Sequence, residues 1–203
     1  MSSLTDLLES DTPDYPAIRQ LLDSLDHPAR LEQLYTLRKK HQAALYELCA
    51  AAEPITFSHF VPDDVPPLQE VVHHGKNTLP AFKLFEKRFC RPDPAPPAER
   101  PELFGYNEGA TRRLIGPGYF VAHATEGNAE WENRGAIVVN YFDVPDGGVV
   151  DGWPSIKPNN SGLQFFVYNK TRDFMRKVSE HASIGVAYKN EKPLGAYFIL
   201  CRE

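Results

Sequence analysis

The first third of the chain carries apolar residues at helical spacing. Within residues 16–25, the apolar positions are Ile18, Leu21, Leu22 and Leu25. This i, i+3, i+4, i+7 pattern predicts an amphipathic helix. A second apolar stripe starts after Pro28 and predicts one longer helix that ends before Pro54.

The segment that follows Pro54 contains both the alternating pattern of strands and the spacing of helices. Alternation over residues 55–61 predicts a short strand. Residues 63–75 begin with acids and end with histidines and a glycine, an order that predicts a helix. A further helix is predicted after Asn77, with apolar residues on one face at Leu79, Phe82, Phe85 and Phe89. Residues 1–90 are therefore predicted to form a helical region.

Proline marks the end of that region. Five of the chain's 18 prolines stand between residues 92 and 101. A segment this rich in proline lacks the N–H donors that a helix or sheet needs. Residues 91–102 are therefore predicted to form a proline-rich linker or loop.

The hydrophobic period then changes to that of strands. Strands are predicted over residues 118–125, 134–144 and 163–169, and a hairpin over 183–201. Helical spacing predicts a helix over 171–182. We therefore expect an α+β fold, with a curved antiparallel sheet of about four to six strands packed on this helix. The strand-rich part, residues 103–203, is expected to form one compact domain with residues 1–90, although a separate helical domain stays open.

Charge narrows the classes of partner. The net charge of −5 arises within residues 1–26, which hold six acids and one base, so the rest of the chain is neutral. A neutral body argues against nucleic acid as a partner, since that affinity needs clustered bases. The apolar runs, such as residues 196–201, are too short for a membrane helix.

Cysteine usage and the N-terminus indicate a compartment. Cys49, Cys90 and Cys201 are odd in number, widely spaced and set among apolar residues, which predicts buried, reduced thiols. The first residues lack the pattern of a secretion or transit signal. We therefore expect a cytoplasmic protein, and a homo-oligomer stays open.

Two groups of residues are candidates for ligand binding. Arg112 and Arg113 stand between glycine-containing turns, where guanidinium groups can meet an anion, or can simply pair with nearby glutamates. Polar or aromatic residues in the predicted strands and in the long loop 145–162 are the second group: Tyr119, His123, Asn140 and Trp153. Such residues either face solvent, pack on the sheet or line a pocket.

Signatures of known chemistry are absent. The chain has no phosphate-binding glycine loop, nucleophile elbow or zinc motif, so no cofactor is expected. No metal site is expected either; the best pair of potential ligands is Glu70 and His74. For acid–base catalysis the candidates are His123 with Asp143 or Asp151.

Three functional hypotheses remain. The leading one is a protein that binds a small, largely apolar ligand with an anionic group in a pocket of the curved sheet. The second is a hydrolase or lyase that uses His123 and a carboxylate. The third is an interaction scaffold that uses the acidic N-terminus and the proline-rich segment.

Overall fold

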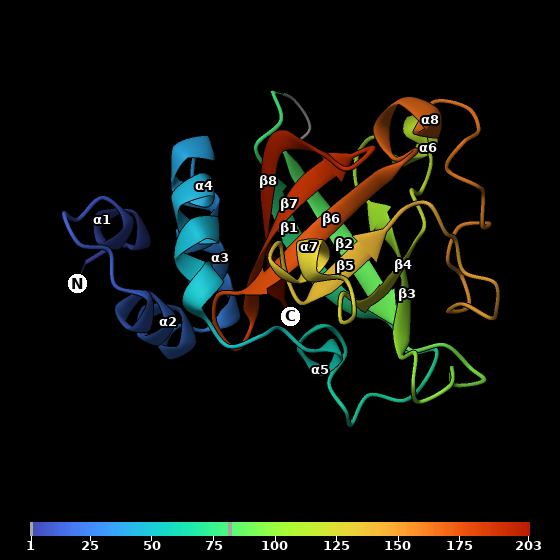
Figure 1. Cartoon of the computed structure of the whole chain (residues 1–203), viewed down its shortest axis with the longest axis horizontal. Helices are drawn as coiled ribbons and strands as arrows, with labels where there is room; N and C mark the ends of the chain where they lie inside the picture. Colours follow the sequence, from blue (N-terminus) through green and yellow to red (C-terminus); the bar gives the residue numbers. More distant parts are fainter. Residues whose placement is uncertain (1, 81–82) are drawn as a thin grey trace.

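The computed structural model describes residues 2–80 and 83–203 (Figure 1). The helices are α1 (Leu4–Leu8), α2 (Tyr15–Ser24), α3 (His27–Thr36), α4 (Lys39–Leu48), α5 (Phe57–Phe60), α6 (Arg112–Ile115), α7 (Ala129–Glu132) and α8 (Gln164–Val167), with a 3₁₀ turn at Cys49–Ala51. The strands are β1 (Val71–Asn77), β2 (Leu84–Cys90), β3 (Glu102–Glu108), β4 (Phe120–Ala124), β5 (Ile137–Asn140), β6 (Thr171–Lys177), β7 (Ala182–Lys189) and β8 (Lys192–Arg202).

The eight strands form a closed antiparallel barrel. Each strand pairs with the next one along the chain, and β8 pairs with β1, where Leu200 lies opposite Gly75. Closure removes the exposed edges of an open sheet. The predicted α+β fold, with an open curved sheet of four to six strands, is therefore wrong.

Three segments that were predicted as helices are strands. These segments are residues 63–75, the residues after Asn77, and residues 171–182, which supply β1, β2 and β6. Of the predicted stripe after Asn77, Phe82 lies outside the described residues. The proline-rich segment therefore connects strands β2 and β3 of the barrel. Two strands of the barrel, β1 and β2, precede it in the chain.

Strand β6 shows why the hydrophobic pattern predicted a helix where the structure has a strand. Asp173 and Met175 face the barrel interior, whereas Phe174 packs on the outside against Trp131 and Tyr188. When both faces of a strand are covered, apolar residues stand on both, and the simple alternation disappears. The charged Asp173 on the inner face obscures this alternation further.

Two short segments show the opposite error, a helix where a strand was predicted. Residues 55–61 and 163–169, which were predicted as strands, hold the single-turn helices α5 and α8. The strands at 118–125 and 134–144 and the hairpin at 183–201 are confirmed. The predicted long helix after Pro28 is two helices, with a break at Leu37.

The N-terminal helices cover one side of the barrel (Figure 1). Leu34 of α3 and Leu45 of α4 share one buried cluster with Ile184 and Ile199 on the outer face of β7 and β8. The three cysteines are free and buried, as predicted.

Acids of the N-terminal segment hold these helices in place. Asp14 and Asp26 accept hydrogen bonds from backbone N–H groups at the starts of α2 and α3. Asp6 completes a capping box with Ser3, and Glu9 pairs with Lys40. The acidic residues that give the chain its net negative charge therefore have local structural roles.

Helix α5 closes one end of the barrel. Phe60 of α5 lies fully buried against His73 of β1 and Phe89 of β2, with ring centroids 5.7 and 4.9 Å away. His73 Nε2 lies 2.9 Å from the Phe60 carbonyl oxygen, and the nearby His59 is also buried. Burial lowers the pKa of His73 to about 3 and lowers that of His59 as well, so both are neutral within this apolar end.

Tight contacts between the barrel wall and its core generate a first prediction. A Cβ on Gly105 would lie 2.4 Å from both the Arg88 carbonyl oxygen and the Phe120 ring, whereas one on Gly109 would meet nothing closer than 3.7 Å. We expect Gly105→Ala to lower the free energy of unfolding by about 1–3 kcal/mol, since the core cannot give way. Gly109→Ala, the matched control, should change it by less than about 0.5 kcal/mol. Equal effects in urea unfolding would contradict the packing described.

The buried histidine generates a second prediction. Below about pH 6.5 the unfolded chain protonates His73, whereas the folded protein resists until about pH 3. Stability that is present above pH 6.5 is therefore lost as the pH falls, by about 1.4 kcal/mol per pH unit. His73→Phe should reduce the slope of unfolding free energy against pH between 6 and 4 by this amount. Phe89→Leu removes no titratable group and should leave the slope unchanged; an unchanged slope in His73→Phe would overturn the assignment.

Candidate functional site

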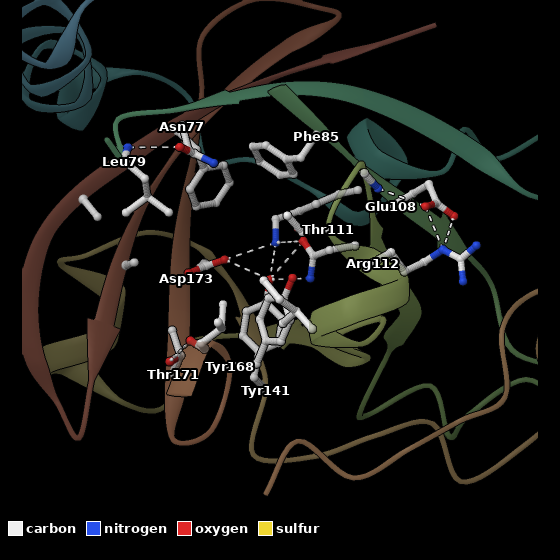
Figure 2. A pocket seen from close by; sticks show the side chains of 18 of the residues that line it. Asn77, Leu79, Phe85, Glu108, Thr111, Arg112, Tyr141, Tyr168, Thr171 and Asp173 are labelled. Atoms are coloured by element: carbon white, nitrogen blue, oxygen red, sulfur yellow. Dashed lines mark hydrogen bonds and ion pairs between the residues drawn. The ribbon is translucent and has the colours of Figure 1, made fainter. Parts of the chain in front are cut away.

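The opposite end of the barrel holds a cavity of about 480 Å³ (Figure 2). Residues from six strands, β1, β2, β3, β6, β7 and β8, line it, together with Tyr141 just after β5 and parts of α6 and α8. Its inner wall is largely apolar, with Phe85, Ala187, Ala196 and Phe198 among the lining residues. The cavity therefore occupies barrel interior that the core side chains leave unfilled.

Lys87 of β2 is the polar centre of this cavity. Its side chain faces inward, and the residue is only 1% exposed. The Nζ atom lies 3.1 Å from both Asn107 Oδ1 and Asp173 Oδ2, and it also bonds to the Tyr141 hydroxyl. Three strands and the end of a fourth therefore converge on one amine.

The partners of Lys87 also bond to one another. Tyr141 donates to Asp173 Oδ2 over 3.2 Å and accepts from Asn107 Nδ2 over 3.1 Å. Asn107 Nδ2 also donates to the Gly118 carbonyl. Within the described chain, the hydrogen bonds from Lys87 and Tyr141 to Asp173 are both made to its Oδ2 atom, and the residue lines the cavity.

Aromatic rings surround the amine. Nζ lies 4.9 Å from the ring centroids of Phe120 and Tyr141 and 5.0 Å from that of Phe198. At these distances the faces of aromatic rings attract a cation. The site can therefore hold a positive charge although little water reaches it.

Burial opposes charge on both members of the Lys87–Asp173 pair. Loss of solvent lowers the pKa of Lys87 and raises that of Asp173, and the attraction between them acts in the opposite direction on each. Burial also raises the pKa of Tyr141, so its hydroxyl keeps its proton. The group as a whole is neutral, whichever of Lys87 and Asp173 holds the proton.

Exposed apolar side chains stand around the cavity entrance. Five residues that line the cavity are large, apolar and between 41% and 73% exposed: Leu79, Leu84, Phe166, Val167 and Leu194. Leu79 lies between β1 and β2, Leu84 and Leu194 lie near the starts of β2 and β8, and the other two belong to α8. The entrance is therefore apolar as well as the interior.

The predicted ligand-binding residues separate in the structure. Arg112 lines the cavity, and its Nε bonds to Glu108 over 2.7 Å. Arg113 instead lines a surface depression near Pro154. Only Arg112 of the predicted set is placed at the cavity, and its charge is already paired.

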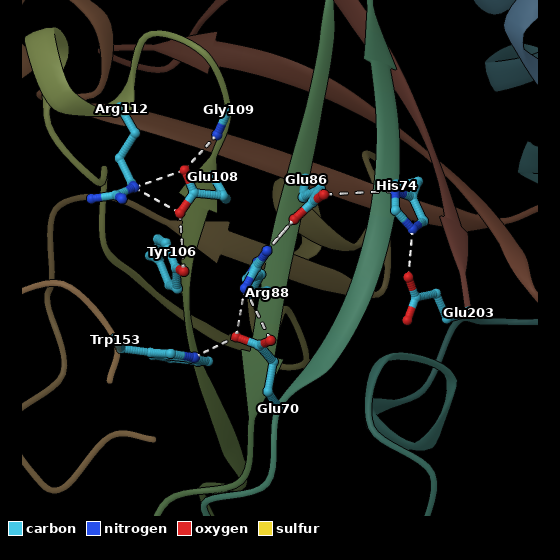
Figure 3. Close-up of polar contacts among 10 residues, drawn as sticks. All are labelled: Glu70, His74, Glu86, Arg88, Tyr106, Glu108, Gly109, Arg112, Trp153 and Glu203. Atoms are coloured by element: carbon cyan, nitrogen blue, oxygen red, sulfur yellow. Dashed lines mark hydrogen bonds and ion pairs between the residues drawn. The ribbon is translucent and has the colours of Figure 1, made fainter. Parts of the chain in front are cut away.

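Tyr119 and Trp153 pack together on the outside of the barrel. Trp153 stacks edge-on against Tyr106, and its Nε1 donates to Glu70 over 2.5 Å (Figure 3). The Tyr119 hydroxyl donates to the Pro154 carbonyl over 2.5 Å. These contacts hold the loop 145–162 against the outer wall.

His123 and Asn140 also lie on the outer wall. His123 and Asp143 line the same outer depression of about 1160 Å³, which also includes Glu102 and Asp146. In the described chain, however, no carboxylate hydrogen-bonds to His123, whose Nδ1 lies 3.0 Å from the Ala124 carbonyl. Asn140 donates to Asp143 over 2.6 Å.

The remaining candidates do not join these groups. Asp151 is exposed and does not line that depression. The catalytic role of His123 with Asp143 or Asp151 stays a prediction.

The candidate metal ligands are partnered separately on the outer wall (Figure 3). Glu70 pairs with Arg88 over 3.0 Å, and His74 bonds to Glu203 over 2.7 Å. Their predicted helical i, i+4 relation is absent, because His74 lies in strand β1 and Glu70 just before it. Among residues 2–80 and 83–203, no group of three or more His, Cys, Asp or Glu side chains is placed to hold a metal.

The central polar group was missed from the sequence. Lys87, Asn107, Tyr141 and Asp173 are separated by up to 86 positions and belong to no motif. One signal existed: in LFEKRFC, Phe85, Lys87 and Phe89 share strand spacing, which places a lysine between two phenylalanines on one face.

Comparisons with protein-family models, with curated proteins and with solved structures found no match to this chain. A search of the described residues for a helix that is long and apolar enough to span a membrane also found none.

The buried pair generates a third prediction. Lys87→Met and Asp173→Asn should each lower the free energy of unfolding by about 3 kcal/mol, since the first removes the donor to Asp173 and the second removes the charge that balances Lys87. The double variant should cost at least about 1 kcal/mol less than the sum, because it removes both partners. Urea unfolding of the four proteins measures this coupling. Costs that add within about 0.5 kcal/mol would show that the two side chains do not support one another.

Proposed function

We propose that this protein binds a small, largely apolar molecule inside the open end of its barrel. The observation that carries the proposal is the 480 Å³ cavity, which lies inside a closed barrel of eight strands. Barrels of this size either fill their interior with side chains or hold one small ligand. The volume also falls within the range of about 300–1,000 Å³ that is typical of small-molecule sites.

The exposed rim supports an apolar ligand. Leu84, Phe166 and Leu194 are at least half exposed while they line the cavity. An apolar ligand that fills the entrance would remove these side chains from water, at a gain of about 25 cal/mol for each Å² covered. A strongly hydrated ligand would obtain no such gain.

The charges at the cavity favour an uncharged polar end on the ligand. Lys87 is balanced by Asp173, and Arg112 is balanced by Glu108. The sequence predicted an anionic group, and such a group would have to displace one of these carboxylates or bind beside it. A hydroxyl or carbonyl meets no such repulsion and can bond to Lys87, Tyr141 or Asp173.

A fourth prediction tests the cavity with two probes of the same chain length. Decan-1-ol and decanoate are titrated by calorimetry, and we expect decan-1-ol to bind at least as tightly as decanoate. Ala187→Phe places a ring into the cavity between β7 and β8 and should weaken decan-1-ol binding at least about tenfold, or 1.4 kcal/mol.

The matched control is Ala98→Phe, which adds the same ring at an exposed position beside the outer depression. It should leave binding unchanged. Binding that survives Ala187→Phe but is lost in Ala98→Phe would move the site to the outer wall and overturn the proposal. Tighter binding of decanoate would restore the anionic ligand that the sequence predicted.

A further inference from the structure

Lys87 differs from the other lysines in its surroundings. It is the charged residue with the lowest exposed fraction among the described residues, at 1%, and it lines a cavity that is open at one end. The buried His59 and His73, near α5 at the other end of the barrel, are not among the residues that line this cavity. An amine that is shielded from water but reachable through an apolar entrance has the setting of a nucleophile.

We propose that Lys87 condenses with the carbonyl carbon of an apolar aldehyde or ketone and holds it as a Schiff base inside the barrel. This inference rests on the proposed function, because it requires the cavity to admit an apolar ligand. It adds the substrate class, a carbonyl compound, and a covalent bond to a named atom, Nζ of Lys87.

The condensation of Lys87 with a carbonyl compound takes two steps. A neutral amine attacks the carbonyl carbon, so that a C–N bond forms and the C=O double bond becomes a single bond; the nitrogen loses one proton and the oxygen gains one, which gives a carbinolamine. Loss of water then breaks the C–O bond and leaves C=N in place of C=O. The sum is one amine and one carbonyl giving one imine and one water, with no oxidant or reductant.

Proton transfers in both steps have partners at hydrogen-bond distance. Asp173 Oδ2 lies 3.1 Å from Nζ and can take the proton that the ammonium must lose before it attacks. As an acid it can then return that proton to the departing oxygen, alone or through Tyr141, whose hydroxyl bonds to the same carboxylate oxygen. No other group has to enter the cavity.

The surroundings of Nζ favour both the neutral amine that reacts and the protonated imine that forms. Burial lowers the pKa of Lys87 and raises that of Asp173, which favours the neutral amine beside a protonated carboxyl group. Once formed, a protonated imine is a cation, and the rings of Phe120, Tyr141 and Phe198 lie about 5 Å from its nitrogen. Asp173 is then its counter-ion.

The chain offers a matched comparison in Lys76. Burial lowers the pKa of Lys76 too, but this residue lies on the outer face of β1 and donates to the Tyr35 carbonyl beneath the helical layer. If a lowered pKa alone determined reactivity, both lysines would react. If the cavity determines it, only Lys87 will.

The experiment traps the imine by reduction. The full-length protein is incubated with decanal and sodium cyanoborohydride at pH 7, and the modified lysine is located by peptide mass mapping. We expect one decyl group per chain, at Lys87, with labelling at least about tenfold faster than at any other lysine. An excess of decan-1-ol should slow it, since both occupy the same cavity.

Variants separate reactivity from folding. Lys87→Met should lose the fast labelling, Lys76→Met should keep it, and Ala187→Phe should lose it with Lys87 still present. Asp173→Asn, which keeps the shape of the side chain but cannot exchange the proton, should slow labelling at least about tenfold. Circular dichroism and urea unfolding show which variants are folded.

The outcomes distinguish this inference from the function on which it rests. Binding of decan-1-ol without labelling of Lys87 would overturn the Schiff base and leave the binding function intact. Labelling spread evenly over surface lysines would do the same. Failure of both binding and labelling would overturn the cavity as a ligand site.

Discussion

The pairing of β8 with β1 is the constraint on which the rest of the structure depends. It joins the last strand of the chain to the first strand of the barrel through five residue pairs, from His73–Arg202 to Asn77–Phe198. Closure fixes which side chains face inward on all eight strands, because successive residues in a strand alternate between its faces. Lys87, Asn107 and Asp173 meet inside the barrel for this reason, although they come from three different strands.

The two ends of the interior differ in how they are filled. Near α5, aromatic rings and two neutral histidines pack against one another in a buried cluster, and this end supplies stability. At the other end the small side chains of Ala187 and Ala196 leave room, and the polar group at Lys87 forms the floor of that space. A buried ion pair contributes little to net stability compared with apolar packing. Its position below an open cavity is better explained by a role toward a ligand.

Part of this arrangement could be predicted from the sequence. The terminal hairpin, the strands around Ala122 and Val139 and the first helices have clear periods and are confirmed. Strands β1, β2 and β6 could not be recognised, because polar residues such as His73, Lys87 and Asp173 face inward, and in β6 the apolar Phe174 also faces outward. The site was missed for the same reason: its residues are distant in sequence and meet only when the barrel closes. Arg112 was singled out and does line the cavity, whereas His123, Asn140 and Trp153 lie on the outer wall.

The central claim is that an apolar ligand occupies the barrel interior at the Lys87 end. Nuclear Overhauser contacts between the chain of bound decan-1-ol and the methyl groups of the protein test this location directly. The account predicts contacts with the methyl groups of Ala187 and Ala196, which are on the inner face of the neighbouring strands β7 and β8. Contacts confined to Val121 and Val144, which line the outer depression, would contradict it.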